Sequence, residues 1–150
     1  MDYGTEAVTI PKIIHFHRAH APDAPALRAL DETDMPFADL AELCSSSASA
    51  LAAMDLGAGD SIAIVLPNGP IMATAFLAVT HLATAAPLNP GLKEAEFAFY
   101  LEDLQARAVI VNGTGRDTGV GGSSIIRHFD NSNPTRGRRA CRIVLIRRRA

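Results

Sequence analysis

The residues best suited to phosphate chemistry form a glycine-rich run, Gly113 to Ser124, which follows a short apolar stretch ending at Val111. Backbone N–H groups of such a run can cradle a phosphate when the run opens a helix. The dinucleotide pattern G-x-G-x-x-G fails here because Thr118 stands at the third glycine position, and no Lys-Ser or Lys-Thr pair follows as in a P-loop. We interpret the run as a flexible connection, with phosphate binding as the open alternative.

Histidines near the N-terminus have the side chains of a metal site but not its spacing. His15 and His17 would share a face only on a strand, whereas Pro11 indicates a helix that runs to His20. His81 lies in a strongly apolar stretch and has no evident partner for base catalysis, so we expect a hydrogen-bonded core histidine or an interface residue.

The carboxylates have ordinary structural explanations. Asp60 follows a glycine at the start of an apolar run, where turn geometry accounts for it. Four acids are spaced as the wet side of one helix: Glu94, Glu96, Glu102 and Asp103. The residue patterns therefore predict no catalytic, cofactor-binding or metal-binding residue.

Hydrophobic periodicity predicts the elements that would position any site. We expect helices over 11–20, 38–56, 71–82 and 93–104, strands over 61–66, 84–88 and 108–111, and a small hairpin within 24–37. Gly57 is placed at a helix C-cap with positive φ, and the last helix should bury one stripe made of Phe97, Tyr100, Leu101 and Leu104. Alternating strands and helices predict an α/β fold with a mostly parallel sheet and crossover helices.

Composition limits the class of protein. The chain has 150 residues, of which 48% are hydrophobic, so it can bury one core. With 5% aromatic residues and no tryptophan, it lacks the stacking platform of single-strand nucleic-acid binders. The formal charge of −2 hides a division: residues 1–112 carry 14 acids against five bases, whereas 113–150 carry nine arginines against two aspartates.

A collinear set of motifs resembles a known family. Gly59 to Pro70 reads GDSIAIVLPNGP, Thr84 to Pro90 reads TAAPLNP, and Glu94 to Val111 continues with an acidic, aromatic helix and an apolar strand. Over about residues 10–112 the chain resembles the N-terminal region of adenylate-forming acyl-CoA synthetases, the AMP-dependent synthetase/ligase family, and is most similar to its oxalate-CoA ligase or peroxisomal-type branch. The fold implied is a partial N-terminal subdomain.

The resemblance also implies a reaction. Full-length members activate a carboxylic acid with ATP and Mg²⁺ to an acyl-adenylate and then transfer the acyl group to coenzyme A. The family's phosphate loop, rich in Thr, Ser and Gly and ending in Pro-Lys, is not found here, and no lysine follows Lys93. No catalytic position carries over, so we expect a truncated ligase, inactive alone and binding no cofactor.

Domain boundaries follow from the same comparison. We expect a partial AMP-binding domain over 1–112 and, over 113–150, an arginine-rich tail that is disordered or outside the family's reading frame. Binding of this tail to nucleic acid and a native, divergent loop are the open alternatives. The sequence does not favour nucleic acid as a partner.

Partners and location follow from exposure and from cysteine usage. Strand and helix residues that later parts of a parent sheet would cover are expected to be partly exposed, namely Ile62, Ile64, Val65, Phe76 and Val79. This predicts marginal stability, and self-association or pairing with a full-length ligase through an open sheet edge. The two cysteines, and an N-terminus without signal-peptide features, favour the cytoplasm, with peroxisomes open for full-length relatives. Residues 71–88 are expected to form a buried helix and a strand, not a membrane span.

Overall fold

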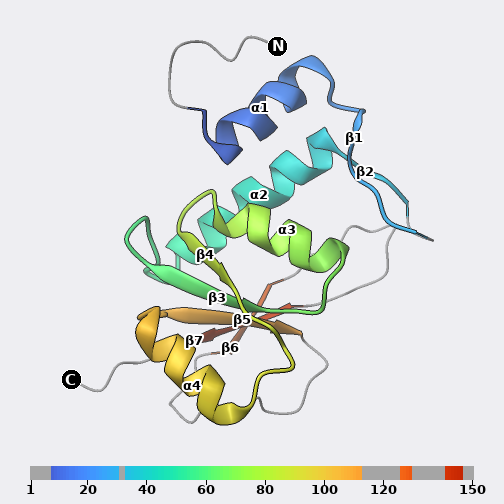
Figure 1. Ribbon diagram of the computed structural model, residues 1–150. Coiled ribbons are helices and arrows are strands. Elements are labelled where there is room, and N and C mark those ends of the chain that lie inside the picture. The colour runs from blue at the N-terminus through green and yellow to red at the C-terminus, as the bar shows by residue number, and fades with distance from the viewer. Residues whose placement is uncertain (1–7, 31–32, 113–125, 130–140, 147–150) are drawn as a thin grey trace.

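Five strands form one sheet in the order β4-β3-β5-β7-β6 (Figure 1). The computed structural model describes residues 8–30, 33–112, 126–129 and 141–146. In chain order the elements are α1 (Ile10–His20), β1 (Pro25–Leu27), β2 (Met35–Pro36), α2 (Phe37–Ala52), β3 (Ser61–Val65), α3 (Pro70–Val79), β4 (Thr84–Pro87), α4 (Glu94–Asp103), β5 (Ala108–Asn112), β6 (Ile126–Phe129) and β7 (Cys141–Leu145). The predicted α/β class and the parallel arrangement of β4, β3 and β5 are confirmed.

Helices cover both faces of the sheet (Figure 1). On β3, Ile62 and Ile64 pack toward the side of α2 and α3, whereas Ala63 and Val65 pack with Phe97 and Leu101 of α4. Side chains alternate between the two faces of a strand, so a strand covered on both faces reads as a continuous apolar run. This explains the sequence SIAIV in β3 and AVIV in β5.

The prediction that core residues would be left partly exposed is wrong for most of them. Ile62, Ile64 and Val79 are fully buried, Val65 is 8% exposed, and only Phe76 is half-buried. The reason is that α2, α3 and α4, together with β7, supply the cover that was expected from later parts of a parent sheet. The partial exposure on which the prediction of marginal stability rests is therefore not found at four of the five positions, Ile62, Ile64, Val65 and Val79.

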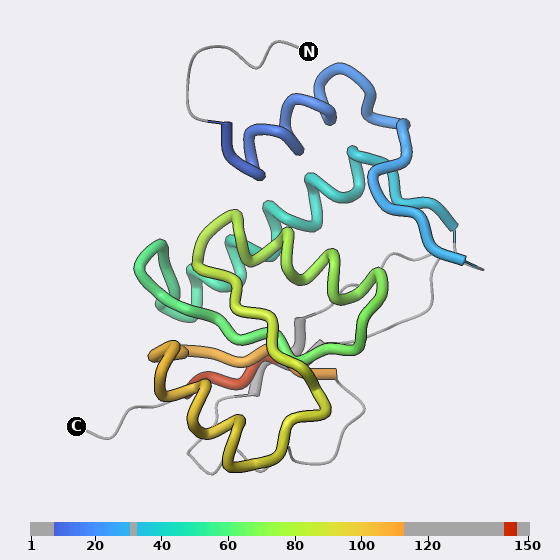
Figure 2. The backbone as a smooth tube through the Cα atoms, in the orientation of Figure 1, coloured from blue at the N-terminus to red at the C-terminus, as the bar shows by residue number. Residues whose placement is uncertain are grey.

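The N-terminal helix and hairpin form a second layer over α2, visible as the stacked blue and cyan tubes in Figure 2. The side chain of Thr9 caps α1 by accepting a hydrogen bond from the Lys12 N–H at 3.5 Å. Ile14 of α1 and Met35 of β2 are buried with Cys44 of α2. The predicted hairpin is confirmed, since β1 and β2 pair antiparallel.

Helix α2 ends four residues before the predicted boundary, and its positive φ belongs to Asp55 (φ 60°), not to Gly57. The Leu56 N–H donates to the Leu51 carbonyl at 3.2 Å and the Asp55 N–H donates to the Ala52 carbonyl at 3.0 Å. These two bonds define a Schellman motif in which Asp55 takes the left-handed position. Burial of both Leu51 and Leu56 fixes the motif there, so Gly57 is not used as the cap.

Helix α4 ends in the same way. Gln105 has φ 49°, and the Ala106 N–H donates to the Leu101 carbonyl at 3.0 Å. Phe97, Leu101 and Leu104 pack against the sheet as predicted, but Tyr100 is 41% exposed and lies outside that stripe. Tyr100 lies three positions after Phe97. Only a narrow face of this helix meets the sheet, so Tyr100 falls at the outer margin of that face.

Two strands lie inside the arginine-rich segment. β7 pairs antiparallel with β5, and β6 pairs antiparallel with β7. Ile143 and Val144 are buried on opposite faces of the sheet. Strands β6 and β7 thus lie within the segment for which disorder or loss of the family frame is predicted, and the division of the chain into 1–112 and 113–150 stays a prediction. The glycine-rich run and the rest of the segment lie outside the described residues.

The apolar stretch 71–88 forms α3, which is 10 residues long, and then β4. Across the part of the chain that the structure describes, no helix is long and apolar enough to cross a membrane.

Candidate functional site

The carboxyl ends of β4, β3 and β5 meet at one edge of the sheet, because the three strands are parallel. Open α/β sheets bind their ligands at this edge. Its described loops are 66–69, after β3, and 88–93, after β4, and Asn112 ends β5. Among these described residues Lys93 is the one charged side chain. The glycine-rich run follows Asn112 in the sequence and lies outside the described residues.

This edge does not fit Mg²⁺–ATP with the residues that are described. Phosphoryl-type chemistry requires cations or a metal at the phosphates, and Mg²⁺ is held by carboxylates. No group of three or more His, Cys, Asp or Glu side chains that could hold a metal ion is found among the described residues. The edge supplies two turns and the N-terminus of α3, and we derive no catalytic step from it.

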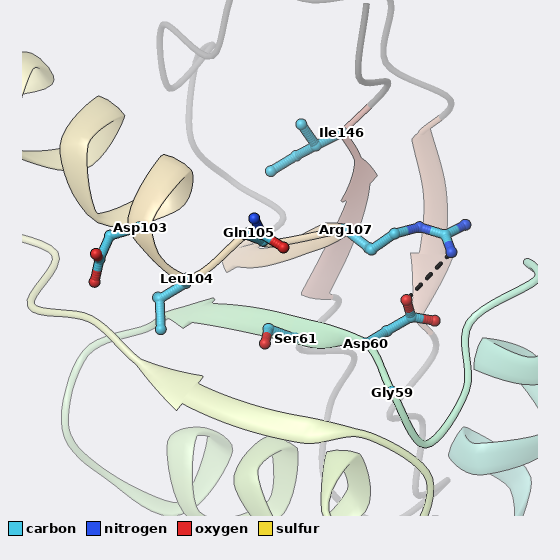
Figure 3. A pocket seen from close by; sticks show the side chains of 8 residues that line it. All are labelled: Gly59, Asp60, Ser61, Asp103, Leu104, Gln105, Arg107 and Ile146. Atoms are coloured by element: carbon cyan, nitrogen blue, oxygen red, sulfur yellow. Dashed lines mark hydrogen bonds and ion pairs between the residues drawn. The ribbon is translucent and has the colours of Figure 1, made fainter. Parts of the chain in front are cut away.

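A polar pocket of about 670 Å³ lies at the opposite edge, at the amino ends of β3 and β5 (Figure 3). Its walls come from the β3 start, the end of α4, the residues before β5 and the end of β7: Gly59, Asp60, Ser61, Asp103, Leu104, Gln105, Arg107 and Ile146. Because substrates of α/β enzymes bind at the other edge, this position indicates a structural role.

Asp60 and Arg107 hold this amino edge together. One carboxylate oxygen of Asp60 accepts from Arg107 Nη1 at 3.2 Å, and the other accepts from the Gly57 N–H at 2.8 Å. Arg107 also donates through Nη2 to the Asp55 carbonyl at 3.2 Å. The Asp60 side chain is 18% exposed, so its bonds are partly shielded from water. The pair thus ties the turn after α2 to the start of β5.

We expect Asp60→Ala to lower the free energy of unfolding by about 1–2 kcal/mol, because the Gly57 N–H and the Arg107 guanidinium both lose an acceptor. Asp60→Asn keeps a side-chain oxygen for one of these donors and should lose less. Urea unfolding followed by circular dichroism measures both. Asp55→Asn is the matched control: the Asp55 carboxylate is fully exposed and lies 3.6 Å from Arg107, so no measurable loss is expected. An equal loss in Asp60→Ala and Asp55→Asn would contradict this role.

The sequence predicts the role of Asp60 in this arrangement but not its pairing with Arg107. Asp60 was interpreted as a turn residue, and its bond to the Gly57 N–H confirms that. Its partner Arg107 was missed because 47 positions separate the two residues, and no local pattern reports a contact at that distance.

The histidines are not brought together as a metal site. His15 is exposed on α1, and its ring centroid lies 6.4 Å from that of His81. His81 Nδ1 lies 2.8 Å from the Leu77 carbonyl, which can only accept, so Nδ1 carries the proton. His81 Nε2 is buried and has no hydrogen-bond partner. His81 is hydrogen-bonded as expected, but it is half-buried and not a core residue, and a role at an interface stays a prediction.

The four acids of α4 are exposed, which agrees with their interpretation as a solvated face. Glu96 also accepts from the Lys93 N–H at 2.8 Å and so caps the start of the helix. That the chain has no catalytic residue stays a prediction.

Comparison with known proteins gives the family. The sequence model of the AMP-binding enzyme family matches residues 15–147, which extends past the end of the resemblance seen in the sequence. The chain is 33% identical over 109 residues to a probable CoA ligase, CCL9, of Humulus lupulus, covering 72% of this chain and 21% of that protein. It is 36% identical over 97 residues to the oxalate–CoA ligase of Arabidopsis thaliana, covering 63% and 19%.

Solved structures agree in fold. The N-terminal subdomain of NpsA from Klebsiella oxytoca is similar with a TM-score of 0.63 and 28% identity, over 73% of this chain and 29% of that one. The N-terminal domain of FACL13 from Mycobacterium tuberculosis, bound to an inhibitor, is similar with a TM-score of 0.60 and 25% identity, over 67% and 26%. The chain spans about a fifth of the length of the curated relatives named above. On the family match and the shared fold, this chain belongs to the AMP-binding enzyme family.

Proposed function

We propose that the chain supplies the N-terminal scaffold of an acyl-CoA ligase. The observation that carries the proposal is the three-stranded parallel core, covered on both faces, in a chain that matches CoA ligases over about a fifth of their length. The complete enzyme would activate a carboxylic acid with ATP and pass the acyl group to coenzyme A. In it, the loops after β3 and β4 would form one wall of the substrate-binding cleft.

The chain by itself is expected to be inactive. Its carboxyl edge offers Lys93 as the one described charged group, and charge stabilisation at the phosphates is the largest requirement of this chemistry. Carboxylate-dependent exchange of pyrophosphate into ATP is the direct assay, with oxalate and medium-chain and long-chain fatty acids as substrates. We expect no exchange above the rate without protein. Exchange that depends on one acid would contradict the proposal.

A chimera tests the scaffold role itself. Residues 8–112 of this chain would replace the matching segment of the Arabidopsis oxalate–CoA ligase. We expect the chimera to form oxalyl-CoA, because the grafted part positions loops and supplies no catalytic group. The same chimera carrying Ile64→Ala is the control: a disturbed core should lower the yield of folded enzyme. A folded chimera without activity would show that the segment does more than position loops.

The sheet has two edge strands, β4 and β6, and the non-enzymatic alternative, pairing of an open sheet edge with a full-length ligase, would use one of them. The Thr84 N–H donates to the carbonyl of Asp60, directly before β3, and the Leu88 N–H donates to the Ile64 carbonyl of β3. Backbone hydrogen-bonding sites alternate along a strand, so those of Ala85 and Pro87 face away from β3. Proline has no N–H, which leaves Ala85 as the outward donor of β4. Proline at a strand edge discourages such pairing. At the β4 edge, this feature favours the scaffold over the pairing module.

A further inference from the structure

The outer face of α4 carries two exposed aromatic rings. Phe99 is 63% exposed and Tyr100 is 41% exposed. Their ring centroids lie 5.6 Å apart at an interplanar angle of 71°. Within the described part of the chain, neither ring packs against the buried core residues. Ala95 and Ala98 on the same helix are exposed as well, so α4 presents apolar surface away from the sheet.

Carboxylates surround the ring pair. Glu96, Glu102 and Asp103 are three or four positions from Phe99 or Tyr100, which places them next to the rings on the helix surface, and all three are exposed. From 93 to 103 the sequence holds four acids and one base, a formal charge of −3. We call Glu96, Phe99, Tyr100, Glu102 and Asp103 the aromatic–acidic face.

Such a face suits a guanidinium group. Arginine stacks on aromatic rings and pairs with carboxylates through the same planar fork, whereas the lysine ammonium is more strongly hydrated and stacks less well. Two copies of this face would repel each other because both are acidic. The complementary surface must therefore be basic and rich in arginine.

The chain itself contains that complement. Residues 113–150 hold nine arginines, no lysine and two aspartates, a formal charge of +7. We propose that the aromatic–acidic face of α4 binds arginines of residues 113–150 of a second copy of this chain, namely those outside β6 and β7, because these two strands belong to the sheet of their own copy. The assembly is head to tail, since each copy offers one face and one segment. It is independent of the ligase proposal and does not use the β4 edge.

Sedimentation equilibrium of the whole chain tests this assembly. In about 20 mM NaCl, we expect the weight-average mass to rise above 15.9 kDa as the protein concentration increases. In about 0.5 M NaCl the mass should return to the monomer value, because salt screens exposed charges. Association through apolar surface alone would not weaken in salt.

Matched variants locate the contact. Phe99→Ser should weaken the association about tenfold. Leu30→Ser is the control, since it also replaces an exposed apolar side chain, 94% exposed and on the hairpin, and should leave the association unchanged. A variant that keeps the charge but removes the guanidinium groups should also weaken it, with lysine at Arg136, Arg138, Arg139, Arg147, Arg148 and Arg149.

The double variant Glu102→Gln, Asp103→Asn leaves the rings in place and should weaken the association at low salt only. A chain that stays monomeric up to about 200 µM at low salt would overturn the proposal. So would an association that Phe99→Ser leaves unchanged while circular dichroism shows the fold intact.

Discussion

Replacing Ile64 with alanine is expected to lower the free energy of unfolding by about 3–4 kcal/mol, the cost of a large cavity in a packed core. Ile64 is the fourth of the five residues of β3 and lies opposite Pro87 of β4 on one side and Ile110 of β5 on the other. Its side chain is fully buried among residues of α2, α3 and the sheet. The cavity would therefore open between the helices and the sheet. A shift of the neighbouring side chains on one side alone could not fill it.

Urea unfolding followed by far-ultraviolet circular dichroism measures this loss, since the chain has no tryptophan. Ile64→Val removes a single methylene group and should cost about 1 kcal/mol, which keeps the test usable if Ile64→Ala does not fold. Leu30→Ala, at a position 94% exposed, should change the unfolding free energy by less than about 0.5 kcal/mol. Equal losses at positions 64 and 30 would show that the β3 core is not packed as described.

Alkaline pH should destabilise the protein through Cys44. This residue is fully buried between α1, α2 and the hairpin, and burial raises the pKa of its thiol from 9.0 to about 11. The buried neutral thiol stabilises the fold fully below pH 9, where both states keep the proton. Between pH 9 and 11 only the unfolded chain loses it, so stability falls by about 2–3 kcal/mol across that interval.

The difference between the wild type and Cys44→Ala isolates this contribution from tyrosine and lysine, which titrate in the same range. We expect the two curves of unfolding free energy against pH to converge or cross between pH 9 and 11, with Cys141→Ser in both proteins so that they differ only in the Cys44 thiol. A pH-independent difference would contradict the burial of Cys44. Thiol labelling at pH 8 gives a second readout, with reaction expected only after unfolding.

The strands that the sequence predicts correctly share one property. β3, β4 and β5 are short apolar runs bounded by Gly, Pro or Asn, and such runs report burial by themselves. The loop after α2 shows the limit of local signals: glycine is the usual left-handed residue, yet Asp55 occupies that position because Leu51 and Leu56 must both be buried.

The features that were missed depend on distant partners. β7 follows an arginine-rich stretch and has no turn signal that points to β5, so its place in the sheet depends on contacts made across more than 30 residues. The role of Arg107 was missed for the same reason, since an isolated arginine before a strand gives no indication that Asp60 lies beside it. Exposure on α4 was predicted for the acids but not for Tyr100, because periodicity alone does not tell how wide a face the sheet covers.

The place of β3 in the sheet has a consequence for synthesis. Its two neighbours arrive in turn: residues 84–87 pair on one side, and residues 108–112 reach the other only after α4 has been made. At ribosomal speed this interval of about 20 residues takes roughly 1–4 s. During it the nascent chain holds one long side of β3 without a hydrogen-bonding partner, and Ala63 and Val65 lack the cover that α4 later provides. A chaperone that binds this nascent chain would find the unpaired side of β3 accessible in that interval, before Ala108 leaves the exit tunnel.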